Sequence, residues 1–276
     1  MTRKSTLEEG GNISGFARIA LLVLAILLVI VSGLIMLSGP MLFRMGLIDL
    51  ATAMGGVLSA AMWTAVVAAV LGLLGLALAF VGAKHRAGIV AVLVTAVAGM
   101  MAGSLFGRNI SREDLPPIHD VQTDWNLPLA FTEATLKERE KAGAVRVRDD
   151  AVIGEHEGRW SGVSFAKAQA DFYGDIKPQL MQGTVASVTA AAAKAAERIG
   201  WTVTRTDAEA GVLEAIYRSP WYELVHDVAL RVTPDGEGVR VDVRATSRLP
   251  GHDMGGNAAL VKDLVGELLQ VSSTSP

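Results

Sequence analysis

Three long apolar runs in the first 110 residues constrain the fold more than any other feature of this sequence. They extend over about 16–38, 58–81 and 87–106, and the only charged residue within them is Arg18, near the start of the first. An apolar helix of about 20 residues covers the roughly 30 Å hydrocarbon core of a bilayer. We therefore expect a transmembrane region with three helices at 16–110. Its first span should be uncleaved, because no small-residue cleavage site follows it.

Lysine and arginine residues near the ends of these runs predict the orientation. Five lie on the N-terminal side or in the turn between the second and third runs, namely Arg3, Lys4, Arg18, Lys84 and Arg86, against Arg44, Arg108 and Arg112 on the other side. Positive side chains favour the cytoplasm. Residues 1–15 are therefore expected to be cytoplasmic. The C-terminal part should lie outside, in the periplasm of a Gram-negative bacterium, as part of a multi-pass protein of the inner membrane.

The runs carry no ionisable residue at mid-membrane depth, which favours an anchor over a transporter. Residues 40–57 are rather apolar and leave two structures open, an interfacial helix or a re-entrant one. Small residues spaced by four, such as Gly99 and Gly103, are typical of close helix packing. That packing fits either one bundle or self-association.

A proline-containing junction at 111–131 separates this region from a soluble domain at 132–270, and 271–276 is expected to be a disordered tail. Pro116 and Pro117 cannot continue a helix and favour an extended chain. The chain contains no cysteine, which excludes disulfides and thiolate metal sites. A net charge of −3 gives no field that would attract nucleic acid, so no nucleic-acid partner is expected.

The soluble part has the pattern of an α+β domain. Thr132 is expected to cap a short charged helix at 132–141, and Thr184 a longer one that ends before Gly200. Asp253 or Asn257 should cap a final helix. The segments rich in β-branched residues predict an antiparallel sheet of about four or five strands, at about 179–182, 201–205, 211–218, 224–232 and 239–246.

Two helices should cover one face of this sheet and leave the other face polar and open. The connection at 234–237 predicts a hairpin in which Thr233 pairs with Gly238 and Asp227 lies opposite Arg244 as an exposed ion pair. The charges of the helix at 132–141 are expected to be solvated. The same is expected of the charges of the open face, namely Arg231, Arg240, Asp242 and Arg244.

Several motifs together resemble a known family. They are Pro-Pro-Ile-His-Asp-Val-Gln-Thr-Asp (116–124), Tyr-Gly-Asp-Ile-Lys-Pro (173–178), Gly-Trp (200–201), Gly-Val-Leu-Glu-Ala (211–215), Asp-Val-Ala-Leu-Arg-Val (227–232), Val-Arg-Val-Asp-Val-Arg (239–244), Ser-Arg (247–248) and Asp-Met-Gly-Gly-Asn-Ala (253–258). Over roughly 115–269 the chain resembles the domain of unknown function family 1499, a family of membrane-anchored bacterial proteins. The resemblance implies a fold and a location, and it assigns no activity. The layout is also similar to helix-grip modules.

Three His-Asp pairs suggest chemistry, and the pair in the junction is the strongest candidate. His119, Asp120 and Asp124 could serve a hydrolase or a metal-dependent enzyme. We favour a structural turn, in which Asp and Thr side chains bond their own backbone and pin the junction to the domain. His226 and Asp227 are adjacent on a strand and point to opposite faces, so they do not predict a metal site.

The start of the last helix is the candidate ligand-binding segment. Backbone N–H groups around Asp253, Gly255, Gly256 and Asn257 could hold an anion, although capping alone explains these residue types equally well. No cofactor is predicted. We expect a membrane-anchored cell-envelope protein that presents an extracytoplasmic binding or scaffolding domain to the lipid bilayer, to other envelope proteins or to lipids. The alternatives are the enzyme described above and a carrier of a lipid or amphiphile in a groove between helices and sheet.

Overall fold

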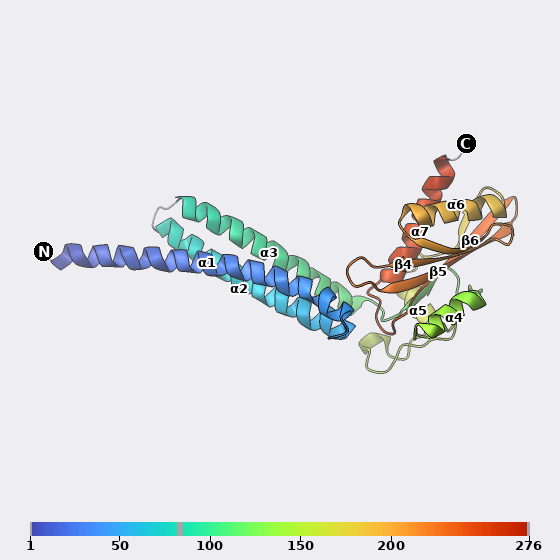
Figure 1. The fold of residues 1–276 in the computed structure, drawn as a ribbon, viewed down its shortest axis with the longest axis horizontal. Coiled ribbons are helices and arrows are strands. Elements are labelled where there is room, and N and C mark those ends of the chain that lie inside the picture. Colours follow the sequence, from blue (N-terminus) through green and yellow to red (C-terminus); the bar gives the residue numbers. More distant parts are fainter. Residues whose placement is uncertain (1, 82–84, 275–276) are drawn as a thin grey trace. The chain divides into compact units, whose positions relative to one another are not determined.

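The computed structural model describes residues 2–81 and 85–274 (Figure 1). The chain forms two compact units, one comprising residues 1–113 and the other residues 114–276. Three apolar N-terminal helices make up the first unit and an α+β domain makes up the second, which confirms the predicted fold class.

The first unit contains α1 (Thr2–Arg44), α2 (Leu58–Val81) and α3 (His85–Asp114). Three stretches are long and apolar enough to cross a membrane, Gly15–Arg44, Thr52–Phe80 and Arg86–Gly107. Small side chains let these helices approach closely. A Cβ atom on Gly72 would lie 2.4 Å from the Thr95 hydroxyl of α3, so only glycine fits at this contact.

The segment at 40–57 forms no separate helix. Instead, α1 continues to Arg44, and a π-helical turn, Thr52–Val57, leads directly into α2. The Asp49 carboxylate accepts a 2.6 Å hydrogen bond from the Thr52 N–H and so caps this second helix. The connection between the two spans is therefore short. The predicted turn at Lys84 lies outside the described residues.

The second unit is a six-stranded antiparallel sheet with four α-helices. The strands run in the order β1-β6-β5-β4-β3, and β2 also pairs with β6. Their bounds are β1 Asp120–Gln122, β2 Gln179–Met181, β3 Thr202–Asp207, β4 Val212–Arg218, β5 Val225–Asp235 and β6 Gly238–Ser247. The helices are α4 Glu133–Lys141, α5 Phe165–Phe172, α6 Val185–Arg198 and α7 Gly256–Thr274.

The helices α6 and α7 pack on one face of the sheet, where the main hydrophobic core lies (Figure 1). Thr184 caps α6 in a reciprocal capping box with Ser187, and Gly200 adopts a φ of 81° just after the helix ends. The apolar side chains that α6 and α7 turn toward the sheet are buried, including Val188, Ala192, Val261, Leu264 and Leu268. Residues 271–274, which were expected to form a disordered tail, belong to α7.

The predicted register of the β5–β6 hairpin is wrong by two residues. Asp235 pairs with Gly238, so the turn contains only Gly236 and Glu237. Gly236 has a φ of 60°, which glycine supplies without strain at the first position of a two-residue turn. A shift of two keeps each side chain on its predicted face. It does, however, place Asp227 opposite Thr246 and not opposite Arg244.

The expectation of an open polar face is also wrong. Residues of the segment 123–150, which includes α4, cover the side of the sheet opposite α6, and Figure 1 shows α4 and α6 on opposite faces. We call this side the charged face, because Glu214, Asp227, Asp242 and Arg244 lie on it and are each at most 2% exposed. Since burying an unpaired charge costs far more than the sheet could offset, the covering segment must supply partners.

Candidate functional site

The junction contributes a strand to the sheet, which the sequence did not predict. Asp120 pairs with Thr246 and Gln122 pairs with Arg244, so β1 lies along the last part of β6. The outer edge of β1 is satisfied by a side chain, because the Gln169 amide of α5 both accepts from the Gln122 N–H (3.1 Å) and donates to the Gln122 carbonyl (2.6 Å). Because successive side chains of a strand point to opposite faces of the sheet, the Asp120 side chain of β1 lies on the charged face.

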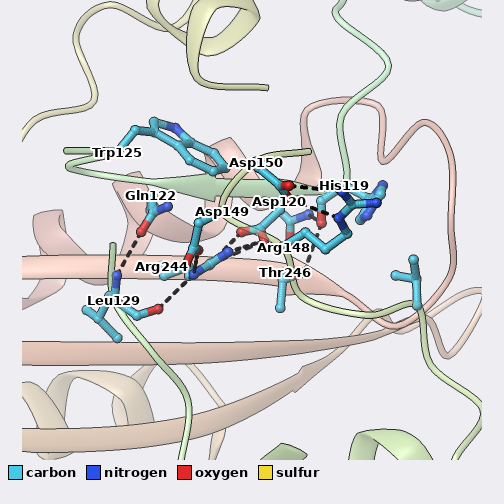
Figure 2. Close-up of polar contacts among 12 residues, drawn as sticks. His119, Asp120, Gln122, Trp125, Leu129, Arg148, Asp149, Asp150, Arg244 and Thr246 are labelled. Carbon is cyan, nitrogen blue, oxygen red and sulfur yellow. Dashed lines mark hydrogen bonds and ion pairs between the residues drawn. The ribbon is translucent and has the colours of Figure 1, made fainter. Parts of the chain in front are cut away.

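Arg244 is the centre of the charged face, and Figure 2 shows the groups that converge on its guanidinium. It donates to the Asp120 carboxylate from Nε (2.9 Å) and from a terminal nitrogen (2.7 Å), and also to the Leu129 carbonyl (2.8 Å) and the Asp149 carboxylate (2.7 Å). The centroid of the Trp125 ring lies 5.8 Å from the guanidinium carbon of Arg244. Burial raises the pKa of Asp120, and the Arg244 charge opposes that rise.

A second group of charges lies near Asp124. Arg240 joins the Asp124 carboxylate (2.5 Å) to that of Asp242 (2.9 Å), and Arg231 contacts Asp242 as well (3.2 Å). The hydrogen bond from Arg240 lowers the pKa of Asp124. Asp124 also accepts from the Asn126 N–H (2.8 Å), the local turn that the sequence predicted. Both acidic candidates of the junction are thus held by arginines of β6.

A third group ties α4 to the sheet. Arg139, expected to be solvated, is 2% exposed and donates to the Asp227 carboxylate (2.5 Å) and to the Ser247 carbonyl (3.1 Å). Arg248 forms two further hydrogen bonds with Asp227, of 2.7 and 2.9 Å. The Glu214 carboxylate accepts from the backbone and hydroxyl of Thr132, at 2.5 and 2.6 Å. A groove of about 320 Å³ with Glu214, Asp227 and Arg248 in its wall opens beside α4.

The start of α7 is built around Asp253. Its carboxylate accepts from the Gly255 N–H (2.9 Å) and the Asn257 N–H (2.7 Å), so the predicted cap is present and these N–H groups are already occupied. The Gly256 N–H donates to the Asp253 carbonyl (3.0 Å). Burial raises the pKa of Asp253 to about 6. The Tyr173 hydroxyl lies beneath this turn, 3.1 Å from where a Cβ atom on Gly255 would be.

Asn257 connects the two candidate segments. Its side-chain nitrogen donates to the His119 carbonyl (2.8 Å), and its oxygen lies 2.9 Å from Nδ1 of the buried His226. Because that oxygen can only accept, Nδ1 of His226 carries a proton. The Ser247 hydroxyl lies 3.1 Å from the same nitrogen, which therefore cannot act as a base toward it. Burial lowers the pKa of His226. His226 is therefore a buried histidine held by side-chain hydrogen bonds.

The structure does not bring His119, Asp120 and Asp124 together as a set. The His119 ring packs edge-on against Phe165 of α5, with 5.0 Å between ring centroids, while each aspartate contacts a different arginine. Within the described residues, no group of three His, Cys, Asp or Glu side chains is arranged to hold a metal ion. The arrangement is that of a structural ionic network with every acidic member paired.

A second groove, of about 490 Å³, lies between α7 and the sheet. Its apolar wall contains Trp201, Tyr217 and Leu260, and its helical wall contains Lys262 and Gly266. Trp201 and Leu260 are each 5% exposed, whereas a Cβ atom on Gly266 would meet nothing within 4 Å. The groove is therefore an amphipathic recess beside a helix that has room for larger side chains.

Comparison with known proteins supports the predicted family. The family model described as "Protein of unknown function (DUF1499)" matches residues 120–268, more than half of the chain. The matched segment begins with the first residue of β1 and ends within α7, so it includes the whole sheet and the charged face. No curated protein matches this chain.

Proposed function

This chain belongs to the DUF1499 family, and we propose that it is a membrane-anchored cell-envelope protein whose α+β domain acts outside the cytoplasm as a binding or scaffolding module. The three membrane-length helices support the anchor. An odd number of spans puts the two ends of a chain on opposite sides of a membrane. The excess of Lys and Arg on the N-terminal side then favours a cytoplasmic N-terminus and, in a Gram-negative cell, a periplasmic domain in the inner membrane.

One observation favours a binding role for this domain over a catalytic one. The two acidic candidates of the junction, Asp120 and Asp124, are engaged by Arg244 and Arg240 at distances of 2.5 to 2.9 Å. A general base or a metal ligand needs a lone pair directed at substrate or metal, whereas these carboxylates are directed at arginines within the domain. The charges therefore support a rigid module, and a hydrolase or metal-dependent enzyme that uses His119, Asp120 and Asp124 is less well supported.

Cysteine labelling tests the topology directly, because the chain contains no cysteine of its own. Glu209→Cys puts a thiol in the exposed β3–β4 turn, and Lys84→Cys puts one between the second and third apolar runs. In cells whose outer membrane is made permeable, a maleimide that cannot cross the inner membrane should label Glu209→Cys. It should label Lys84→Cys only after lysis. The reverse pattern would contradict the proposed location.

Alanine substitution tests recognition against catalysis. Partners that co-purify with the protein in mild detergent should still bind His119→Ala, because the His119 ring packs against Phe165 and the hydrogen bond to Asn257 comes from the backbone carbonyl. Asp124→Ala should behave in the same way, with a modest loss of stability. Loss of a cellular phenotype in both variants, with folding and partner binding intact, would instead favour the enzyme.

The groove of about 490 Å³ supports a second candidate, the binding of a lipid or amphiphile. Gly266→Leu adds a bulky side chain beside this recess, where nothing lies within 4 Å of the Gly266 Cβ position, and Gly266→Ala is the matched control. We expect mass spectrometry of the purified protein to detect a bound amphiphile that Gly266→Leu displaces and Gly266→Ala retains. An identical lipid content in all three proteins would exclude the groove as the site.

A further inference from the structure

Three separate connections of the second unit meet at one end of the sheet. The chain enters β1 at this end, since Asp120 pairs with Thr246 at the end of β6. The loop 219–224 lies here too, because Arg218 of β4 pairs with Val225 of β5. The loop 248–255 follows directly from β6. The turns 208–211 and 236–237 lie at the opposite end.

This end of the sheet exposes large apolar side chains. Trp221 is 62% exposed in the loop 219–224, and Leu249 is 41% exposed in the loop 248–255. An exposed tryptophan in a loop contributes nothing to the core of its own domain. Trp and Tyr side chains are enriched where a protein meets the headgroup region of a bilayer, because an amphipathic ring suits that layer.

The same end carries exposed arginines, together with one exposed carboxylate, Glu223 of the loop 219–224. Val145 donates to the Arg248 carbonyl, which brings the exposed Arg146 to this end, and Arg218 is the exposed last residue of β4. Among the described residues, neither Arg146 nor Arg218 has an ion-pair partner. Elsewhere on the charged face, arginines are matched by carboxylates. Free arginines beside an exposed tryptophan are complementary to an anionic lipid surface.

The covalent chain from the membrane-length helices enters the second unit at this end. The membrane-length stretch of α3 ends at Gly107, and its helix ends at Asp114. Only six residue steps then separate Asp114 from the first residue of β1, Asp120. A fully extended chain of that length spans about 20 Å, since each residue contributes at most about 3.6 Å. The turns at 208–211 and 236–237 have no such constraint.

We propose that this end of the sheet is a membrane-docking surface, in which Trp221 and Leu249 enter the headgroup layer of the anchoring bilayer and Arg146 and Arg218 contact anionic headgroups. The proposal rests on the membrane anchor of the proposed function, and it is independent of which side of the membrane the domain occupies. Docking would hold the domain in one orientation and direct the hairpin turn 236–237 away from the lipid.

Depth-dependent quenching of the full-length protein in nanodiscs tests this surface. Pro250→Cys puts a single fluorophore beside Leu249, and Glu237→Cys puts the same fluorophore at the opposite end of the sheet as a matched control. The nanodiscs contain phosphatidylcholine and phosphatidylglycerol in a ratio of three to one, with a spin label on a fraction of the headgroups. We expect at least threefold stronger quenching at position 250 than at position 237.

Surface variants then identify the groups responsible. Trp221→Ser combined with Leu249→Ser should bring quenching at position 250 down to the level at position 237. The pair Arg146→Gln and Arg218→Gln should reduce it in discs that contain phosphatidylglycerol and leave it unchanged in phosphatidylcholine alone. Thermal unfolding should be unaffected, since these four side chains are exposed.

The outcomes separate this proposal from the one on which it rests. A protein that incorporates into nanodiscs but shows equal, weak quenching at both positions overturns the docking surface and leaves the anchor in place. A protein that does not incorporate into nanodiscs overturns the anchor itself. Quenching at position 250 that persists when both apolar side chains are removed would also overturn the docking surface.

Discussion

The guanidinium of Arg244 and the carboxylate of Asp120 form a buried ion pair with hydrogen bonds of 2.9 and 2.7 Å, although 124 positions separate them in the sequence. The side chains are 1% and 3% exposed. The pair joins the first strand of the domain to its last strand at the point where the chain arrives from the membrane helices. It therefore fixes the junction to the sheet.

Removing Arg244 should destabilise the domain strongly. Arg244→Met leaves the Asp120 carboxylate buried without its cation, a change that typically costs about 3–5 kcal/mol. Adding Asp120→Leu should restore much of this loss, because no buried unpaired charge remains: Asp149, the other carboxylate that Arg244 contacts, is 56% exposed. The control is Arg148→Gln, which breaks an ion pair with Asp150 whose side chains are 62% and 77% exposed, and it should cost under about 1 kcal/mol. Urea unfolding followed by tryptophan fluorescence measures all four proteins, and equal losses for Arg244→Met and Arg148→Gln would contradict the structural role.

Substitutions of two cationic residues of α4 should differ sharply in their effect on the free energy of unfolding. Arg139→Met removes a partner of Asp227 and leaves the carbonyls of Val145 and Ser247 without a donor. Each buried group that loses its partner costs about 1–3 kcal/mol, so we expect a loss of at least about 2 kcal/mol. Lys137→Met, on the exposed side of the same helix, should change the free energy of unfolding by less than about 0.5 kcal/mol. A solvated α4 would give similar small values for both variants.

Glycine is required at position 211 for two reasons. Its φ is 71°, and a Cβ atom would lie 2.2 Å from the Val232 carbonyl oxygen of the neighbouring strand. A left-handed conformation alone costs an L-residue about 1–2 kcal/mol. Gly236→Ala, with a φ of 60° and open space around the Cβ position, isolates that cost. Thermal unfolding should show a clearly larger loss of stability for Gly211→Ala than for Gly236→Ala. Similar losses would mean that β4 and β5 separate easily to admit the methyl group.

Asp253 should make stability depend on pH in a defined window. Burial raises its pKa from an ordinary 3.8 to about 6, so the folded state binds the proton more tightly than the unfolded state. The stability that proton binding to Asp253 contributes is therefore complete below about pH 4, and it is lost as the pH rises toward 6. Asp253→Asn keeps a capping side chain without titrating. The difference in unfolding free energy between the variant and the natural protein should grow in favour of the variant from pH 4 to pH 6.5. A constant difference across that range would contradict the raised pKa.

The sequence by itself determined the elements whose signals are local. Long apolar runs specify membrane-length helices, and the Thr184 cap, the apolar spacing and Gly200 define α6 within one or two residues. The alternation of β5 and β6 predicted which side chains face α6 and α7, and a register error of two left those faces unchanged. These features depend on residues a few positions apart, so they can be read along the chain.

Only the tertiary structure shows that the residues of the charged face are buried. Arg139, Glu214 and Arg244 have the composition of a solvated surface, and nothing near them in the sequence indicates that they are buried. Glu214 and Arg244 find partners 79 to 124 positions away, in a segment from 120 to 149 with little periodic pattern. Arg139 belongs to that segment and pairs with Asp227, 88 positions away. Burial of a charge becomes favourable only when such distant groups arrive together, because desolvation must be offset by several hydrogen bonds at once. The same physical reason explains why Asp120 and Asp124 resembled catalytic residues in the sequence and are ion-pair partners in the folded domain.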